Sequence, residues 1–174
     1  RREAQALRAL FRALSRETLA ALKQPLQDFY YRVFTELTRD VHGSLIAVLP
    51  VTGARMDIFS DAVILAEPLS IPAAIESYAR NPGVEEIAGL YSRASLIRGM
   101  LGCDGITLFR SDGVLLGYNA FIQPTRAMRQ ALVGARRRAF EALAGHVGHG
   151  VNLAVYRSQD GALDYIGVPD KPEA

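Results

Sequence analysis

The chain has 174 residues, of which 49% are hydrophobic and 22% charged, and its formal net charge is +2. This length is sufficient for one domain with a substantial core, and the composition is ordinary for a soluble globular protein. The small net charge argues against a general DNA- or RNA-binding surface, the longest apolar stretches are too short for a membrane helix, and the single Cys103 excludes an internal disulfide.

Features at the start of the chain favour a cytoplasmic protein. The first 17 residues are too charged for the apolar segment of a signal peptide. A single cysteine suits a reducing compartment, and we expect no membrane segment in this chain. Because the sequence begins with Arg1 rather than methionine, it is compatible with a fragment of a longer protein.

The N-terminal region, residues 1–40, is expected to be a helical extension. Apolar residues recur at helical spacing over 1–22, Pro25 interrupts the pattern, and a second amphipathic helix follows to about Thr38. His42 and Gly43 then end the helical region. The apolar stripe of this extension suits either packing on a sheet or a coupling or dimerising role.

The central region combines one clear strand with two helices. The run SLIAVLPV predicts a buried strand, whereas residues 56–69 are ambiguous and are compatible with a second short strand. Residues 71–81 predict a helix that starts near Pro72 and ends at Pro82-Gly83. Residues 84–102 predict a longer helix.

The C-terminal region predicts two hairpins separated by a helix. The first hairpin covers 106–122, with its turn at 111–113, and the second turns at Asp160-Gly161. Residues 126–145 are expected to be helical, divided near Gly134. We therefore predict an α/β fold, a mixed β-sheet flanked by helices over residues 41–168, followed by a loose tail at 169–174.

A cluster of arginines marks the segment GARRRAFEALAG, residues 134–145. The amino end of a helix carries partial positive charge, which favours anions and disfavours cations. Five arginines nevertheless occur before the next acid, Glu141: Arg126, Arg129, Arg136, Arg137 and Arg138. The pattern predicts either a site for a small anion or simply a solvated helix face.

Asp104-Gly105, between a predicted helix and a predicted strand, is by itself only a turn. If this turn faces the basic helix start after Gly134, backbone amides and guanidinium groups together form a phosphate site. The two segments thus support each other.

In their order, LIRGMLGCDGITLF, SDGVLLGYNAFIQP, GARRRAFEALAG and VNLAVYRSQDG resemble the diadenylate cyclase (DAC) domain, which joins two ATP molecules into cyclic di-AMP. The resemblance covers about residues 42–167. It places Asp104 and Gly105 on the family's DGA motif, with Ile106 in place of the alanine. In the family this aspartate helps bind Mg²⁺ or Mn²⁺ and activate the attacking ribose hydroxyl. The glycine and the two arginines of the phosphate-binding motif are matched by Gly134, Arg136 and Arg138.

The sequence departs from the family at positions that bear on catalysis. Ala135 replaces a threonine that donates to phosphate, and Arg137 replaces a histidine. After Val155, the residues Tyr156 and Arg157 replace a Ser-Glu/Gln pair, which removes a possible metal ligand. The resemblance therefore points to DAC-like nucleotide sensors of the DACNV type, which are associated with bacterial signalling and anti-phage defence. Arg137 and Arg157 become secondary phosphate-binding candidates.

The expected ligand is an adenine nucleotide or cyclic dinucleotide, with an effector outside this chain and a possible homo-oligomer. Alternatives are an active diadenylate cyclase, with Asp104 catalytic, and a basic protein-interaction module. Tyr118 is selected as the base-stacking residue from four tyrosines, Tyr78, Tyr91, Tyr118 and Tyr156, although core packing is the favoured explanation for each of them. Weaker candidates are a metal site at His146 and His149, a reactive Cys103, and paired carboxylates at Asp57 and Asp61.

Overall fold

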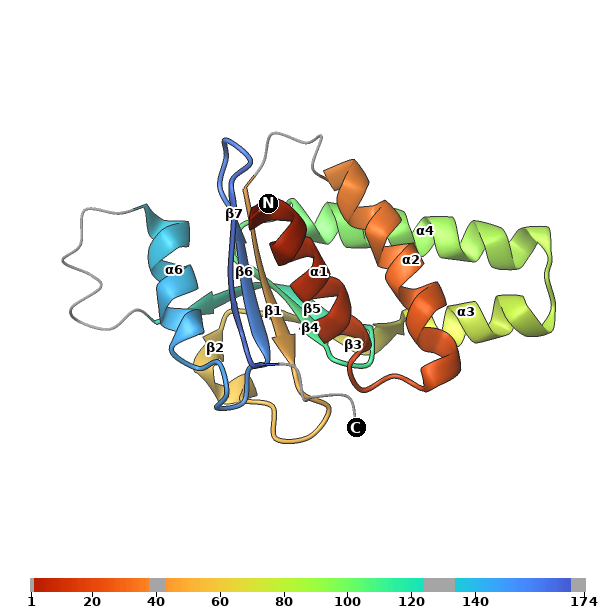
Figure 1. Cartoon of the computed structure of the whole chain (residues 1–174), viewed down its shortest axis with the longest axis horizontal. Coiled ribbons are helices and arrows are strands. Elements are labelled where there is room, and N and C mark those ends of the chain that lie inside the picture. The colour runs from red at the N-terminus through yellow and green to blue at the C-terminus, as the bar shows by residue number, and fades with distance from the viewer. Residues whose placement is uncertain (1, 38–42, 124–133, 170–174) are drawn as a thin grey trace.

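A computed structural model describes residues 2–37, 43–123 and 134–169. Within these ranges, one mixed sheet has the strand order β2-β5-β4-β1-β6-β7, and β3 also pairs with β5 (Figure 1). The strands are β1 Ser44–Leu49, β2 Phe59–Ser60, β3 Val63–Ser70, β4 Ile106–Arg110, β5 Val114–Ile122, β6 Leu153–Arg157 and β7 Leu163–Gly167. The helices are α1 Arg2–Ser15, α2 Ala20–Leu37, the short 3₁₀ helix η1 Met56–Ile58, α3 Ile71–Arg80, α4 Val84–Leu101 and α6 Ala135–Ala144. The prediction of an α/β fold with a mixed sheet and a helical N-terminal region is confirmed.

The centre of the sheet is the parallel pair β1 and β4. All six residues of β1 are buried, as expected for a strand that is covered on both faces. Leu45 pairs with Ile106, so both strands begin at the same edge of the sheet. Strand β6 runs antiparallel to β1 and ends at that edge with Arg157, which pairs with Ser44. This edge positions the candidate site described below.

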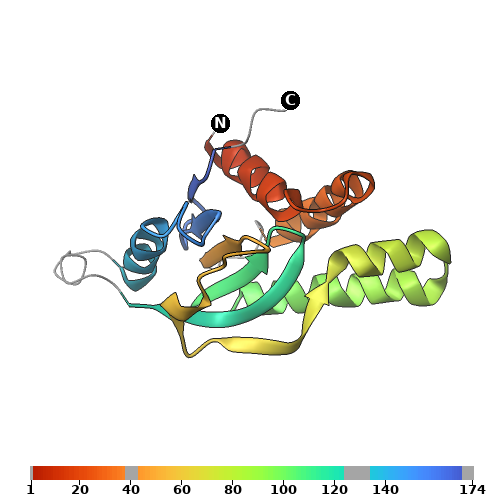
Figure 2. The same cartoon turned by 90° about the horizontal axis from the view of Figure 1, so that it is seen from below.

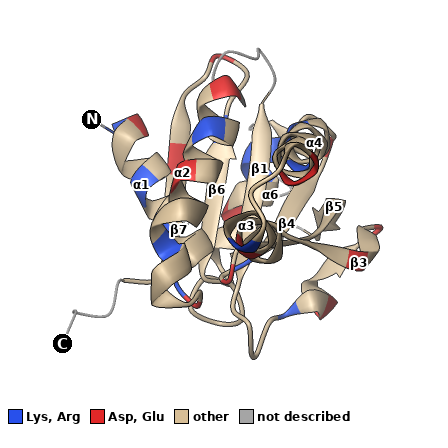
Figure 3. Cartoon of the chain, turned by 90° about the vertical axis from the view of Figure 1, so that its right-hand side faces the viewer, with Lys and Arg blue, Asp and Glu red and all other residues tan. Residues whose placement is uncertain are grey.

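Four helices cover one face of the sheet. In Figures 1 and 2, α1 and α2 lie over β1, β6 and β7, while α3 and α4 form a hairpin that extends beyond the strands. Buried Leu10, Leu14 and Leu26 belong to the same core cluster as Phe109 and Val155 of the sheet. Acidic and basic residues both occur along these helices (Figure 3). The N-terminal helices therefore share the core of the sheet through their apolar stripe.

The opposite face is covered by α6. Its buried Phe140 and Leu143 form a second core cluster with Leu45, Ala47 and Leu108. The two clusters correspond to the two faces of the same strands, because successive side chains of a strand point to opposite sides. Helix α6 is thereby anchored by its apolar residues while its first turn lies at the sheet edge.

The N-terminal helices differ from the prediction in their boundary. The predicted helix over 1–22 ends at Ser15, and a second helix begins at Ala20 and continues through Pro25. Ser15 donates its hydroxyl to the carbonyl of Phe11, which is a local alternative to continued helix. Buried Leu26, Tyr30 and Phe34 pack α2 into the core, which offsets the cost of a proline in a helix, about 3 kcal/mol.

The remaining elements follow the predictions closely. Both hairpins are present as antiparallel pairs, β4 with β5 and β6 with β7. The ambiguous stretch 56–69 contains η1, β2 and most of β3, and α3 is capped by the side chain of Ser70. Some of the predictions fall outside the described residues. These are the boundary expected near residue 40, the first part of the helix expected over 126–145, most of the tail, and the residues His42, Arg126 and Arg129.

Candidate anion-binding site

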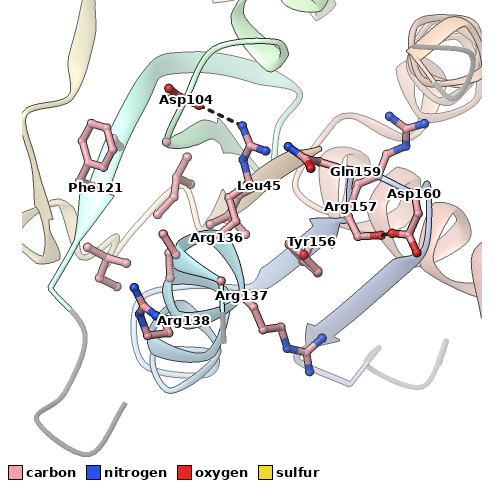
Figure 4. Close-up of a pocket in the computed structure, with 18 residues that line it drawn as sticks. Leu45, Asp104, Phe121, Arg136, Arg137, Arg138, Tyr156, Arg157, Gln159 and Asp160 are labelled. Carbon is pink, nitrogen blue, oxygen red and sulfur yellow. Dashed lines mark hydrogen bonds and ion pairs between the residues drawn. The ribbon is translucent and has the colours of Figure 1, made fainter. Parts of the chain in front are cut away.

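A cavity of about 900 Å³ lies between the start of α6 and the edge of the sheet where β1 and β4 begin (Figure 4). Its walls come from the turn before β4, the end of β5, the first turns of α6, the end of β6 and the turn that follows β6. A cavity of this size is at the upper end of the range found for small-molecule sites. It brings together seven of the predicted site residues: Asp104, Gly105, Gly134, Arg136, Arg137, Arg138 and Arg157.

The amino end of α6 faces this cavity. Gly134 is the N-cap residue, with extended backbone (φ −60°, ψ 154°), and as a glycine it has no side chain to accept a hydrogen bond from the first turn. The first turn also contains no acidic residue. The first amides of a helix lack partners within the helix, so this end presents donors and partial positive charge to the cavity. The prediction that the arginines lie in the first turn of a helix is confirmed.

Arg136 lies beside the residues that precede the two parallel strands at this edge. Its Nη2 lies 3.0 Å from Oδ1 of Asp104, which precedes β4. On the other side, its Nη1 lies against Gly43, which precedes β1, and a Cβ added to Gly43 would come within 2.9 Å of that nitrogen. Figure 4 shows the Arg136 side chain extended toward Asp104. Sequence reasoning missed Gly43 because nothing in the local pattern places it beside α6.

Arg137 has a different environment. Its Nε is 3.2 Å from Glu141, its Nη1 is 2.9 Å from Asp164 of β7, and its guanidinium carbon is 5.2 Å from the centroid of the Phe140 ring. It also lies 5.8 Å from the Tyr156 ring centroid. Partial burial alone would lower the pKa of Arg137, but the hydrogen bonds to the two carboxylates outweigh it and raise that pKa. Arg137 therefore joins α6 to the sheet instead of presenting its donors to the cavity.

The other two arginines line the cavity from different directions. Arg138 is partly buried and points away from Arg137 in Figure 4. Arg157, at the end of β6, is only 7% exposed. In Figure 4 its guanidinium points away from Arg136 and from α6, so Arg157 borders the cavity without directing its charge toward the start of α6.

The Asp104-Gly105 turn depends on glycine. Gly105 has a φ of +83°, and a Cβ at this position would lie 2.8 Å from the carbonyl oxygen of Ala120. Only glycine adopts this backbone region readily and allows such close approach. The turn directs Asp104 outward, with 85% of its side chain exposed.

The aromatic residue selected from the sequence does not lie in this cavity. Tyr118 lines a separate cavity together with Tyr91 and Cys103. The register of β5 against β4 is irregular here and Asn119 has a positive φ of 54°, so the alternation of side chains along β5 is interrupted. The cavity instead contains Phe121, which is 43% exposed, and Tyr156. A large exposed apolar side chain at a cavity wall could be recognised only from the structure.

The donor set does not fit a metal ion held by the protein. Within the described parts of the chain, no three His, Cys, Asp or Glu side chains gather closely enough to hold one. Asp104 is paired with Arg136, and Asp160, on another wall of the cavity, accepts a hydrogen bond from Ser158. The described residues thus form no metal cage made of protein ligands alone, and we assign no chemical step to a metal here.

The structure does not bring the weaker candidates, the two histidines, Cys103 and the two carboxylates Asp57 and Asp61, together in one site. His146 and His149 follow the end of α6 in a turn, where the amide of His149 donates to the carbonyl of His146. Cys103 is partly buried near the carbonyl of Gly99. Asp57 lies in η1 and is bound by Arg55, and Asp61 has a positive φ in the turn before β3. The two carboxylates therefore do not share a helix face.

Comparisons with known proteins leave the family open. No family model matches the sequence, and no curated protein matches it. Among solved structures, the chain resembles a hypothetical membrane-spanning protein from Bacillus cereus, with a TM-score of 0.48 and 16% sequence identity over 81% of this chain and 63% of that one. The match thus spans less than two thirds of that protein's length. In the described parts of the present chain, no helix combines the length and apolar character needed to cross a bilayer.

Proposed function

We propose that this chain is a nucleotide-binding sensor domain of the DAC-like type, and that the cavity beside α6 binds an adenine nucleotide or a cyclic dinucleotide. One observation carries the proposal. The amino end of α6, whose N-cap residue is a glycine, lines a cavity of about 900 Å³ together with Arg136, Arg138 and the Asp104-Gly105 turn. Phosphate groups bind favourably at such a helix end, where backbone donors and the helix dipole act together.

The lining of the cavity suits the two parts of a nucleotide. Arg136 and Arg138 supply positive charge at the start of α6, as phosphate oxygens require. Phe121 supplies an exposed aromatic surface, and bases stack on aromatic side chains with little dependence on their identity. Together these groups would hold a ligand that is anionic at one end and aromatic at the other.

Binding without catalysis is favoured by the residues that replace the cyclase motifs. Arg157 stands where the resembled family has an acid or amide, and the side chain of Ala135 has no hydroxyl to donate. We therefore propose that ligand binding is signalled to an effector outside this chain. We place this function in the cytoplasm, because its reducing conditions keep a single cysteine such as Cys103 in the thiol form.

A diadenylate cyclase remains the second candidate because Asp104 is 85% exposed at the cavity, where it could reach a bound nucleotide. Production of cyclic di-AMP from ATP with Mn²⁺ or Mg²⁺, lost in Asp104→Asn, would replace the sensor proposal with this activity. A basic protein-interaction module is the alternative if no nucleotide binds.

Thermal unfolding in the presence of adenine nucleotides and cyclic dinucleotides tests the proposal. A ligand at a hundred times its Kd adds about 2.7 kcal/mol, which for a domain of this size raises Tm by roughly 5–10 °C. Arg136→Ala should weaken binding by about 10- to 150-fold, because it removes a charge-assisted hydrogen bond of roughly 1.5–3 kcal/mol.

The matched control is Arg55→Ala. Arg55 also forms an exposed ion pair, with Asp57 at 2.6 Å, but it lies outside the cavity. Binding should be unchanged in this variant. If no nucleotide raises Tm, or if both variants bind equally well, the proposed site is wrong.

A further inference from the structure

The ion pair between Arg136 and Asp104 lies at the place where a ligand phosphate would bind. The two side chains approach to 3.0 Å, and both belong to the cavity wall. A carboxylate and a phosphate present similar oxygens to a guanidinium group. Asp104 and a bound phosphate would therefore compete for the same donors of Arg136.

The geometry favours such an exchange. Asp104 is 85% exposed, whereas Arg136 is 28% exposed and lies against Gly43. Exposed ion pairs contribute only about 0–1 kcal/mol, so Asp104 can release the guanidinium at little cost. Gly43, which has no side chain, leaves room for the Arg136 guanidinium whether or not Asp104 is bound to it.

The cavity also contains carboxylates that oppose additional negative charge. Asp104 and Asp160 lie on different walls (Figure 4). Arg137, although it lines the cavity, is bound by Glu141 and Asp164. A ligand with many negative charges would therefore meet repulsion as well as attraction in this site.

We propose that Asp104 determines the charge selectivity of this site, so that it accepts nucleotides with about two negative charges, such as a nucleoside monophosphate or a cyclic dinucleotide, in preference to a triphosphate. This inference rests on the proposed nucleotide-binding function. A displaced Asp104 remains close to the bound phosphate, where it tolerates a low ligand charge and repels a high one. One unit charge at about 4 Å in water contributes about 1 kcal/mol, which corresponds to roughly fivefold in affinity.

Calorimetric titration of AMP, ADP, ATP and cyclic di-AMP, in EDTA to keep the triphosphate free of metal, tests the inference. The unaltered protein should bind AMP or cyclic di-AMP more tightly than ATP. Asp104→Asn should tighten binding of all four ligands and increase the ATP-to-AMP affinity ratio by about fivefold. Asp57→Asn is the matched control, because it removes an equally charged partner of an arginine outside the cavity and should leave this ratio unchanged.

The outcomes separate this inference from the proposed function. If none of the ligands binds to either protein, the nucleotide-binding function itself is wrong. If nucleotides bind but the ATP-to-AMP ratio is unchanged in Asp104→Asn, or all ligands bind more weakly, Asp104 does not act as a competing anion. Weaker binding would instead indicate that its carboxylate contacts the ligand.

Discussion

The three consecutive arginines in the first turn of α6 do not share one environment. Arg136 contacts Asp104 and Gly43, and Arg137 binds acids of α6 and β7. Successive residues of an α-helix point about 100° apart, so neighbours in sequence face different parts of the fold. A run of like charges therefore need not act as one surface, and each arginine requires its own interpretation.

Gly43→Ala tests whether the position of Arg136 matters for binding. The added Cβ would lie 2.9 Å from both the Arg136 Nη1 and the carbonyl oxygen of Arg157, so the guanidinium must move. We expect nucleotide affinity to fall by about tenfold, the equivalent of one hydrogen bond of roughly 1.4 kcal/mol. Titration should be accompanied by a Tm measurement that confirms folding. Gly99→Ala, where a Cβ meets nothing within 4 Å, is the control. Equal affinity in both variants would contradict the assigned position of Arg136.

At the scale of elements, α2 is joined to the sheet by one buried hydrogen bond and an aromatic contact. The Tyr30 hydroxyl donates to the carbonyl of Gly113, in the turn between β4 and β5, at 2.8 Å. The Tyr30 ring meets Phe109 edge-on, with centroids 5.8 Å apart. Gly113 has a positive φ and lies against Leu26 of the same helix. These contacts explain how α2 remains continuous through Pro25.

Tyr30→Phe should lower the free energy of unfolding by about 1–3 kcal/mol at neutral pH, because the Gly113 carbonyl loses its buried donor. Burial, reinforced by the charge of Asp112, raises the pKa of Tyr30 above its ordinary value of 10.0. The unfolded chain therefore ionises first, and this part of the stability is lost as the pH rises above about 10. Tyr30 should thus contribute less to the free energy of unfolding at high pH, and the difference in that free energy between wild type and Tyr30→Phe should narrow.

Urea unfolding between pH 7 and pH 11 measures this difference. The neighbouring Tyr31→Phe is the control, because Tyr31 is 56% exposed and its loss should change stability by less than about 0.5 kcal/mol. A constant gap between wild type and Tyr30→Phe across this range would show that Tyr30 titrates as an ordinary tyrosine.

At the scale of the whole molecule, Asp164 connects the two layers that cover the sheet. It lies in β7 and binds Arg2 of α1 at 3.0 Å and Arg137 of α6 at 2.9 Å. Helix α1 packs in one core cluster and α6 in the other. The candidate site, at the start of α6, is thereby linked to the N-terminal helices through the edge of the sheet.

Asp164→Asn should lower Tm by about 2–4 °C at pH 7, the equivalent of roughly 1 kcal/mol for partly exposed ion pairs. Partial burial acts to raise the pKa of Asp164, but the hydrogen bond from Arg137 and the charge of Arg2 lower it on balance. A lowered pKa contributes stability that is present at neutral pH and is lost as the pH falls through the acidic range. Denaturant unfolding at pH 7 and at about pH 3 should therefore show a smaller difference in acid. The same difference at both pH values would exclude an ionic role for Asp164.

Local patterns in the sequence were sufficient to predict most helices and strands of this fold. Apolar runs of β-branched residues predicted β1 and both hairpins, and Gly105 and Gly134 marked the turn and the helix start that border the cavity. These signals are local, since they depend on side-chain periodicity and on the backbone freedom of glycine. The sequence alone thus determined the α/β class and the segments that could form a phosphate site.

Only the tertiary structure decided which side chains meet. Asp104 and Arg136 are 32 positions apart, and their contact depends on the order in which the strands pair. The same order brings Gly43 beside Arg136, while the irregular register of β5 places Phe121, and not Tyr118, in the cavity. Strand order and register arise from packing between distant segments, which no local pattern contains.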